Sequence, residues 1–280
     1  MGKRFLLLGL ALLLVFSMAA CTPSEPGGEA GETQGEVSGG SIGEVPTAVE
    51  GSFIVGFDQN FPPMGFVGDD GEFTGFDLDL AAEVANRLGL ELVLQPIAWD
   101  AKDMELSSKN IDCIWNGFTI NGREDDYTWT VPYMSNTQVF VVRADSGINS
   151  FADLAGKTVV VQADSSAETA LVDRPDLVDT FGDYIKAADY LGALMDLESG
   201  AVDAVAMDDT VANYQMESRE KDFVVLEEAL SPEDYGVGFL LGNEALRDIV
   251  QATLEEMAAD GKMAEISHNW FGKDITTIGK

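Results

Sequence analysis

The sequence of 280 residues is poor in basic residues. Lysine and arginine together number 16, against 49 aspartates and glutamates, and the formal net charge is −33. A surface this acidic repels the phosphates of nucleic acids and the head groups of anionic lipids. Nucleic acid is therefore excluded as a partner.

Residues that commonly carry out catalysis or bind metals are also scarce. Cys21 and Cys113 are the only cysteines, and His268 is the only histidine. No nucleophile motif or metal-ligand spacing accompanies them, so we expect no cofactor and no metal. The stretch GDDGE (68–72) lacks the spacing of a calcium loop and predicts a hairpin turn. We expect His268, in a late helix, to be a packed or surface residue rather than a base.

Only one long apolar run occurs, at the N-terminus. Lys3 and Arg4 precede the apolar run of Phe5 to Phe16, which is too short to span a membrane well and is typical of a signal peptide over 1–20. Small residues follow, and the segment resembles a bacterial lipoprotein signal, cleaved before Cys21 and lipidated there, for example with palmitate. The alternative is ordinary secretion with a free Cys21. No later apolar run reaches 18 residues, so we expect no other membrane span.

Residues 21–50 are expected to form a disordered tether. They contain seven glycines, six glutamates and three prolines, and no aromatic residue. Such a segment cannot bury enough apolar surface to offset its ordering entropy. A lipid, a tether and a globular body together predict a protein anchored to the cell membrane, on its extracellular or periplasmic face.

Strand and helix patterns alternate in the remaining 230 residues or so, which are enough for one large domain or two modest ones. This alternation predicts an α/β fold with a largely parallel sheet. The expected strands are 53–57, 91–97, 111–115 and 158–162. The expected helices are 76–89, 100–108, 165–171, which a serine caps, and a capped helix at 243–261.

A weak internal sequence repeat predicts two lobes of similar architecture. Residues 104–115 align with residues 195–206 without gaps. The alternative is chance, because helix–turn–strand units look alike. At the same offset Gly117 corresponds to Asp208, so both strands would end on candidate site residues.

The stretch DCIWNGFTINGRED (112–125) predicts a binding site. An apolar strand ends at Asn116-Gly117, and Arg123 follows among acidic residues. Ligands of open parallel sheets lie beyond the carboxyl ends of strands, and an arginine there can hold a planar anion with two hydrogen bonds. The alternative is that Arg123 only pairs with Glu124 or Asp126 on the surface.

Several stretches together resemble a known family. They are VGFDQNFPPMGF (55–66), DGEFTGFDLDLAAEVANRLG (70–89), IDCIWNGFTINGREDDYTWTVPY (111–133), GKTVVVQADSSAE (156–168), DAVAMDDTVANY (203–214) and DGKMAEISHNWFG (260–272). The chain is similar over essentially all of residues 51–280 to the family 3 extracellular solute-binding proteins, the amino-acid receptors of ABC importers.

The resemblance implies a type II periplasmic-binding-protein-like α/β fold with two lobes joined by two hinge crossings. Lobe 1 would hold residues 51–138 and 238–280, and lobe 2 residues 139–237. The crossings would lie near Val139-Phe140 and Gly236-Val237. A ligand that touches both lobes would then favour the closed state.

The resemblance also implies which residues bind the head group of an amino acid. Arg123 would bind the α-carboxylate, which Ser165-Ser166 at a helix N-terminus would cap from the other lobe. Asp208 would bind the α-ammonium, although it could instead be an exposed turn acid. Thr119 and the backbone of Gly117 would hold both groups.

Five further residues would select the ligand side chain. Phe61 and Trp99 offer flat apolar faces, or are plain core, while Asp58, Asn116 and Gln162 offer polar groups. No lysine or arginine stands at a matching position, so a second carboxylate would be left unpaired. We therefore expect a polar or basic amino acid such as glutamine, histidine, arginine or lysine, and cystine remains open.

The sequence departs from the family pattern at two places. The loop 120–122 is one residue shorter, and Asp164 stands where the family often has glycine. Asp164 would either repel the ligand carboxylate or cap the helix that starts at Ser165, and capping is our expectation.

The resemblance implies a monomeric binding protein that is not an enzyme and that delivers its amino acid to an ABC permease. Three alternatives belong to other classes. One is an enzyme on the same fold, dehydratase-like, another is a ligand receptor for a signalling membrane protein, and the third is a structural lipoprotein.

Overall fold

The structure is a computed structural model that describes residues 45–219 and 222–280. The predicted signal peptide, Cys21 and most of the tether lie outside the described residues. Residues 42–280 form one compact unit. In the described part of the chain, no helix is both long and apolar enough to cross a membrane.

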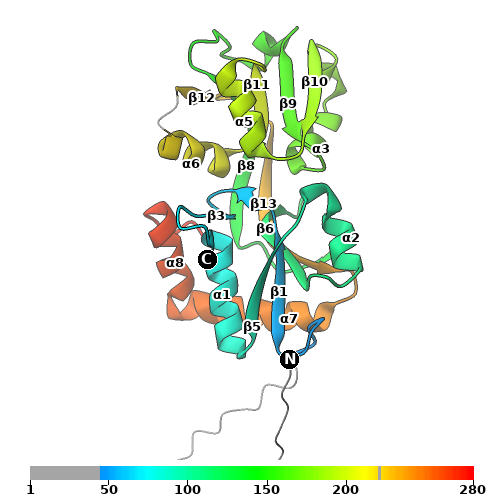
Figure 1. The fold of residues 1–280 in the computed structure, drawn as a ribbon, viewed down its shortest axis with the longest axis vertical. Helices are drawn as coiled ribbons and strands as arrows, with labels where there is room; N and C mark the ends of the chain where they lie inside the picture. The colour runs from blue at the N-terminus through cyan, green and yellow to red at the C-terminus, as the bar shows by residue number, and fades with distance from the viewer. Residues whose placement is uncertain (1–44, 220–221) are drawn as a thin grey trace, which may run out of the picture. The chain divides into compact units, whose positions relative to one another are not determined.

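One large sheet runs through this unit, in the order β10-β9-β11-β8-β13-β6-β1-β5, with β12 beside β8 and β7 beside β13. Its strands are parallel at both ends of this order, whereas every pairing of the two central strands, β8 (Met134–Arg143) and β13 (Ser231–Leu240), is antiparallel. The sheet is therefore mixed rather than largely parallel. The central strands run in opposite directions because they carry the chain between two lobes and back (Figure 1).

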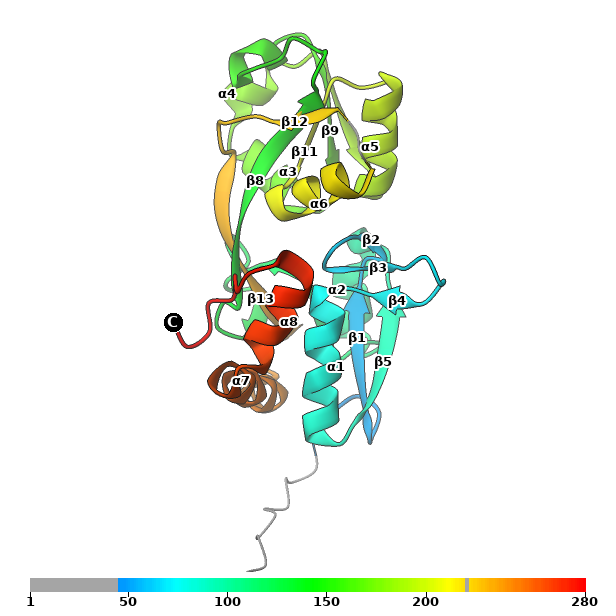
Figure 2. The ribbon, with the colours of Figure 1, turned by 90° about the vertical axis from the view of Figure 1, so that its left-hand side faces the viewer.

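Lobe 1 contains one parallel end of the sheet and four α-helices (Figures 1 and 2). Its strands in the large sheet are β1 (Ser52–Phe57), β5 (Glu91–Pro96), β6 (Cys113–Thr119) and β7 (Tyr127–Trp129). A small antiparallel sheet adds β2 (Asn60–Phe61), β3 (Gly65–Val67) and β4 (Phe73–Thr74). The helices are α1 (Phe76–Leu88), η1 (Trp99–Ala101), α2 (Lys102–Ser107), α7 (Glu244–Asp260) and α8 (Lys262–Phe271).

Lobe 2 contains the other parallel end. Its strands are β9 (Thr158–Gln162), β10 (Asp183–Ala187), β11 (Ala204–Asp208) and the antiparallel β12 (Phe223–Val225). Its helices are η2 (Phe151–Leu154), α3 (Ser166–Val172), α4 (Pro175–Val178), α5 (Tyr190–Ser199) and α6 (Asp209–Arg219).

The expected elements are present, with differences at their ends. Helix α1 stops where predicted, because Gly89 adopts the left-handed conformation that ends a helix. The expected helix 100–108 is the short 3₁₀ helix η1 followed by α2. The expected capping of α7 is present at its C-terminus, where Gly261 adopts the left-handed conformation, whereas the side chain of Asn243 makes no capping hydrogen bond at the other end. The stretch 68–72 is the predicted hairpin turn between β3 and β4.

Aromatic clusters anchor the strands that carry the site. On β6, Phe118 packs against Trp99 at 5.4 Å and Trp129 at 4.7 Å between ring centroids. In lobe 2, Phe140 packs against Phe151 at 5.1 Å. Full burial of one such ring stabilises a fold by roughly 1.5–3 kcal/mol. These rings therefore hold β6 and β8 firmly in their lobes.

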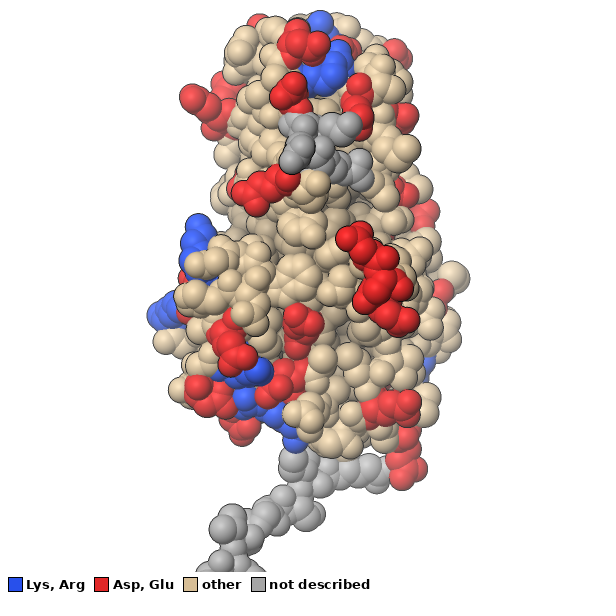
Figure 3. All heavy atoms as spheres, turned by 60° about the vertical axis from the view of Figure 1, so that its left-hand side comes forward, with Lys and Arg blue, Asp and Glu red and all other residues tan. Residues whose placement is uncertain are grey.

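Acidic side chains are spread over the face of the molecule drawn in Figure 3, and basic side chains form fewer groups there. This distribution matches the net charge of −33. Most of these charged side chains are exposed to solvent, as charged side chains usually are in proteins.

Candidate functional site

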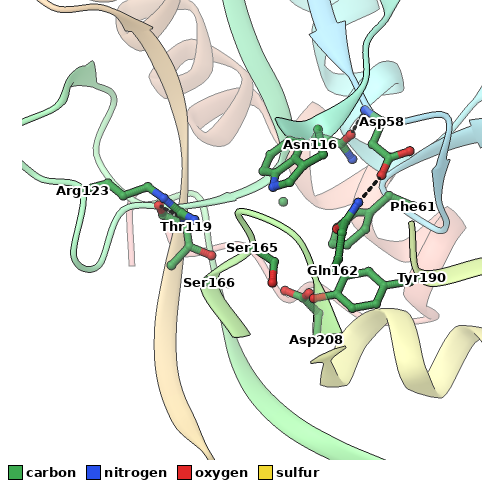
Figure 4. Close-up of a pocket in the computed structure, with 12 residues that line it drawn as sticks. Asp58, Phe61, Asn116, Thr119, Arg123, Gln162, Ser165, Ser166, Tyr190 and Asp208 are labelled. Atoms are coloured by element: carbon green, nitrogen blue, oxygen red, sulfur yellow. Dashed lines mark hydrogen bonds between the residues drawn. The ribbon is translucent and has the colours of Figure 1, made fainter. Parts of the chain in front are cut away.

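A small pocket lies between the lobes (Figure 4), and its free space of about 10 Å³ is roughly the room of one water molecule. All eleven candidate ligand-binding residues line it, together with Tyr190. They are Asp58, Phe61, Trp99, Asn116, Gly117, Thr119 and Arg123 from lobe 1 and Gln162, Ser165, Ser166 and Asp208 from lobe 2.

Strand β6 does not end where the sequence predicted. We expected a strand at 111–115 that stops at Asn116-Gly117, whereas β6 spans Cys113–Thr119. Its register against β13 shifts between Gly236 and Gly238, which marks a β-bulge. Because a bulge redirects side chains without ending the strand, β6 presents its polar residues to the pocket and then continues.

Gly117 lies at this bulge with a φ of 55°, in the left-handed region. A Cβ atom there would lie 3.0 Å from the Phe61 ring and 3.1 Å from the Tyr235 ring, so the position favours glycine. The N–H of Gly117 donates to Oδ2 of Asp77 at 2.5 Å, and the Tyr133 hydroxyl donates to the same carboxyl group. Asp77 therefore fixes the bulge from behind the pocket.

The guanidinium of Arg123 is held by backbone carbonyls rather than by a carboxylate. It donates to the carbonyl oxygen of Thr119 at 3.3 Å and to that of Asp164 at 3.1 Å. Among the described residues, no carboxylate forms an ion pair with Arg123, so the alternative of pairing with Glu124 or Asp126 is wrong. Its charge is available to a ligand.

Asp164 does not cap helix α3, contrary to our expectation. The cap is Ser165, whose hydroxyl accepts a backbone N–H of the first turn at 3.1 Å. Asp164 has a φ of 58°, a conformation that glycine adopts most easily, and its carboxylate points outward to Lys102 at 3.7 Å. Its carbonyl oxygen accepts hydrogen bonds across the pocket from Trp99 Nε1 at 3.1 Å and from Lys102. The two lobes are therefore in direct contact.

Asp208 ends β11 and is only 3% exposed, so it is not an exposed turn acid. Its Oδ1 accepts hydrogen bonds from the Tyr235 hydroxyl at 2.5 Å, Gln138 Nε2 at 2.8 Å and Asn136 Nδ2 at 3.0 Å. Burial, followed by the negative charge of Glu233, raises the pKa of Asp208 well above its ordinary value. Among the described residues, no cation forms an ion pair with this carboxyl group.

The side of the pocket away from Arg123 holds Asp58, Asn116 and Gln162 (Figure 4). The backbone N–H of Asp58 donates to Asn116 Oδ1, and Gln162 Nε2 donates across the lobes to Asp58 Oδ2 at 2.8 Å. Burial raises the pKa of Asp58. Among the described residues, the buried Asn116 Nδ2 has no hydrogen-bond partner. Such an atom is costly unless a ligand satisfies it.

Phe61 and Trp99 are both core and lining. Each belongs to a buried hydrophobic cluster, which for Phe61 extends into lobe 2, and each also lines the pocket. The ring of Phe61 lies 5.9 Å from that of Tyr190, across the lobes. The two expected roles for these aromatic residues are therefore compatible.

Sequence reasoning missed Tyr190 and the polar residues behind Asp208. A tyrosine that opens a helix is an ordinary core residue, so Tyr190 gave no signal. Asn136 and Gln138 gave no signal either, because they lie in a run of four polar residues, Ser135 to Gln138, without alternation. Only the structure shows that these two side chains are buried while Ser135 is exposed.

The described residues contain no group of three or more His, Cys, Asp and Glu side chains that could hold a metal ion. His268 is exposed on α8, where its Nδ1 lies 2.8 Å from the Ala264 carbonyl oxygen. It is not among the residues that line the pocket.

Comparisons with known proteins agree with this geometry. A model of the bacterial extracellular solute-binding proteins, family 3, matches residues 53–273. The L-cystine-binding protein TcyJ of Escherichia coli (strain K12) is 35% identical over 231 residues, which cover 81% of this chain and 85% of TcyJ.

Solved structures match as well. An ABC uptake transporter substrate-binding protein from Streptococcus pneumoniae with bound histidine has a TM-score of 0.78 and 35% identity, covering 81% of this chain and 94% of its own. The arginine-, lysine-, histidine-binding protein ArtJ from Geobacillus stearothermophilus has a TM-score of 0.71 and 33% identity, covering 80% and 96%. The resemblance and the type II two-lobed fold are confirmed, and the chain belongs to the bacterial extracellular solute-binding proteins of family 3.

Proposed function

We propose that this protein captures a free amino acid between its two lobes and delivers it to the permease of an ABC importer. One observation carries the proposal. A guanidinium without a carboxylate partner, Arg123, and a carboxyl group without a cation, Asp208, line one pocket from opposite lobes. Their charges complement the zwitterionic head group of an amino acid, which would satisfy both.

The head group would bind as follows. The α-carboxylate would accept hydrogen bonds from Arg123 and from Ser165 and Ser166 of the other lobe. The α-ammonium would donate to Asp208 and Thr119, and Gly117 at the bulge would contribute its carbonyl oxygen, because its N–H already donates to Asp77. All of these residues line the pocket.

The side chain of the ligand would lie toward Asp58, Asn116 and Gln162, between the aromatic faces of Phe61 and Trp99. Asp58 accepts hydrogen bonds, which favours ligands that donate. Asn116 Nδ2 lacks an acceptor, which favours ligands that also accept. A second carboxylate would meet Asp58, so we expect a polar or basic side chain, with cystine still a candidate.

Closure of the lobes around the ligand would form the state that docks on the permease. We propose lobes of 51–138 plus 238–280 and 139–237, with hinges near Val139-Phe140 and Gly236-Val237. The change of strand partners supports these bounds, because β8 pairs with β13 up to Gln138 and with β11 from Gln138 onward.

We further propose that the chain is a monomer, lipid-anchored at Cys21 to the outer face of the cell membrane, and that it releases its ligand unchanged. The relatives are solute-binding components of transporters rather than enzymes. The lining of the pocket contains no histidine and no cysteine, which supports binding without catalysis.

A thermal unfolding screen tests the proposal. The protein is unfolded and refolded to remove bound ligand and then heated with each of the twenty amino acids, cystine and ornithine. A ligand at about 100 times its dissociation constant adds roughly 2.7 kcal/mol to the free energy of unfolding. We expect a clear rise of the melting temperature for a few polar or basic amino acids.

Modified ligands provide the control. The N-acetyl and carboxamide derivatives of the best ligand lack one charge of the head group each, so neither should raise the melting temperature. Equal shifts for a derivative and its parent would contradict recognition of the zwitterion. No shift with any amino acid would contradict the proposed function.

A further inference from the structure

Glu233 is a buried carboxyl group behind the proposed ammonium site, and it is only 4% exposed. It lies on β13 within the segment Ser231–Tyr235, which pairs with β8 where the chain passes between the lobes. It does not line the pocket. Its contacts nevertheless reach ligand-binding groups of both lobes.

These contacts link Thr119 to Asp208. Glu233 Oε2 accepts the hydroxyl hydrogen of Thr119 at 2.9 Å. Glu233 Oε1 accepts hydrogen bonds from Asn136 Nδ2 at 2.6 Å and from Gln138 Nε2 at 2.8 Å. The same two nitrogen atoms lie 3.0 and 2.8 Å from Oδ1 of Asp208. One hinge residue therefore holds the side chains that would bind the ammonium from lobe 1 and from lobe 2.

The contact with Glu233 fixes what Thr119 can do. A threonine hydroxyl has one hydrogen, and Thr119 gives it to Glu233. Only its lone pairs remain for a ligand, so the hydroxyl can accept from an ammonium but cannot donate to a carboxylate. Thr119 consequently belongs with Asp208 on the ammonium side of the site.

The carboxyl group of Asp208 has no counterion in an empty pocket. Asp208 and Glu233 share the same amide donors, and among the described residues neither forms an ion pair with a cation. The titratable groups that face them are Tyr235 of β13 and Tyr190 of α5, whose pKa values are raised well above 10 by burial and by the charge of Asp208. Arg123 is the only cationic residue that lines the pocket. Burial and the negative charge of Glu233 raise the pKa of Asp208, so Asp208 retains its proton.

We propose that Glu233 is a positioning residue of the ammonium site, and that Asp208 beside it gives up a proton when the ligand enters. The ammonium keeps its three hydrogens and donates hydrogen bonds to Asp208 and Thr119. The Asp208 proton leaves to solvent, and the ammonium replaces its positive charge. This inference rests on the proposed function.

Isothermal titration calorimetry in phosphate and in Tris buffer at equal pH measures the protons released, because the buffers differ in heat of ionisation. The probes are free L-glutamine, L-arginine, L-histidine and L-cystine. We expect wild-type protein to release close to one proton per ligand at neutral pH. Its affinity should rise with pH between 5 and 7, by up to about tenfold per pH unit, since one proton competes with the ligand.

The variant Glu233→Gln isolates the role of this residue. The variant removes the negative charge that, after burial, raises the pKa of Asp208. We expect the variant to bind the same amino acid, to release less proton per ligand at neutral pH and to show a shallower pH profile than wild type. The control Glu227→Gln removes an exposed carboxylate near the same strand and should behave as wild type.

Three results would overturn the inference. Wild-type binding without proton release and without pH dependence would do so, even if the variant failed to fold. Equal proton release by wild type and Glu233→Gln would remove Glu233 from the mechanism. If no amino acid binds at all, the proposed function fails first, and the inference fails with it.

Discussion

Replacing Arg123 by alanine is expected to weaken amino-acid binding about 100-fold or more. No carboxylate among the described residues occupies the guanidinium, which contacts only the carbonyl oxygens of Thr119 and Asp164. Removing one partner of a buried, hydrogen-bonded charge pair costs about 2–5 kcal/mol. Arg123→Lys should also bind weakly, because an ammonium group cannot reproduce the two parallel hydrogen bonds of a guanidinium.

Arg174 provides a matched control. It is a half-buried arginine whose guanidinium lies 5.4 Å above the ring of Phe151, as that of Arg123 lies 5.4 Å above Phe118. Calorimetric titration of Arg174→Ala should give the wild-type affinity. The assignment of Arg123 fails if both alanine variants lose affinity equally, or if Arg123→Ala binds within about threefold of wild type.

The substitution Arg123→Ala should weaken ligand binding without greatly weakening the fold. Arg123 contributes two hydrogen bonds to backbone carbonyls and one contact over an aromatic ring. Contacts of this kind at a half-buried position contribute about 1 kcal/mol each at most. Urea unfolding of ligand-free Arg123→Ala should therefore show a modest change, which separates lost recognition from a lost fold.

The sequence predicted those helices and strands that are determined by residues close together in the chain. Helix α1 ends within one residue of the prediction because apolar spacing and Gly89 both act within the helix. Strand β9 has the predicted bounds because its valines are buried on both faces. The Ser165 cap also follows from short-range chemistry, since its acceptor and donor lie three residues apart.

The bulge in β6 could not be predicted in this way. It depends on the register with β13, which lies more than 100 residues later in the chain, and on the contact with Asp77 of helix α1. The sequence shows only Asn-Gly, which also fits the end of a strand. A signal that is compatible with both structures cannot decide between them.

The candidate site came mainly from the resemblance, which carried each residue to its position. Local sequence left the role of Arg123 open, because acidic neighbours in sequence need not be neighbours in space. Glu233 was missed for the same reason, since its partners Thr119 and Asn136 meet it only through the crossing strands. A residue such as Glu233, whose partners come from other strands, has no local sequence motif by which it could be found.

Asp77 is expected to make the free energy of unfolding depend on pH. This residue is fully buried, accepts the Gly117 N–H at 2.5 Å and accepts the Tyr133 hydroxyl at 2.8 Å. Burial raises the pKa of Asp77 from 3.8 to about 7. Below pH 3.8 the carboxyl group is protonated in both the folded and the unfolded chain. As the pH rises toward 7, the unfolded chain loses the proton first, so the free energy of unfolding falls.

Replacing Asp77 by asparagine should remove this dependence. Between pH 5 and pH 8, wild type should lose about 2–3 kcal/mol of unfolding free energy through Asp77 alone, which follows from 1.36 kcal/mol per pKa unit. Asparagine does not titrate, yet its carbonyl oxygen can still accept the Gly117 N–H. Urea unfolding of ligand-free protein at both pH values measures the difference.

Asp79→Asn supplies the control, because it removes an exposed carboxylate from the same helical turn and should keep the wild-type pH slope. If Asp77→Asn unfolds with the wild-type slope, Asp77 is ionised in the fold at pH 5. The carboxylate would then be stabilised by its hydrogen bonds to Gly117 and Tyr133 despite burial. The bulge that presents Gly117 to the pocket would depend on a charged group, and Asp77→Asn should then also weaken amino-acid binding.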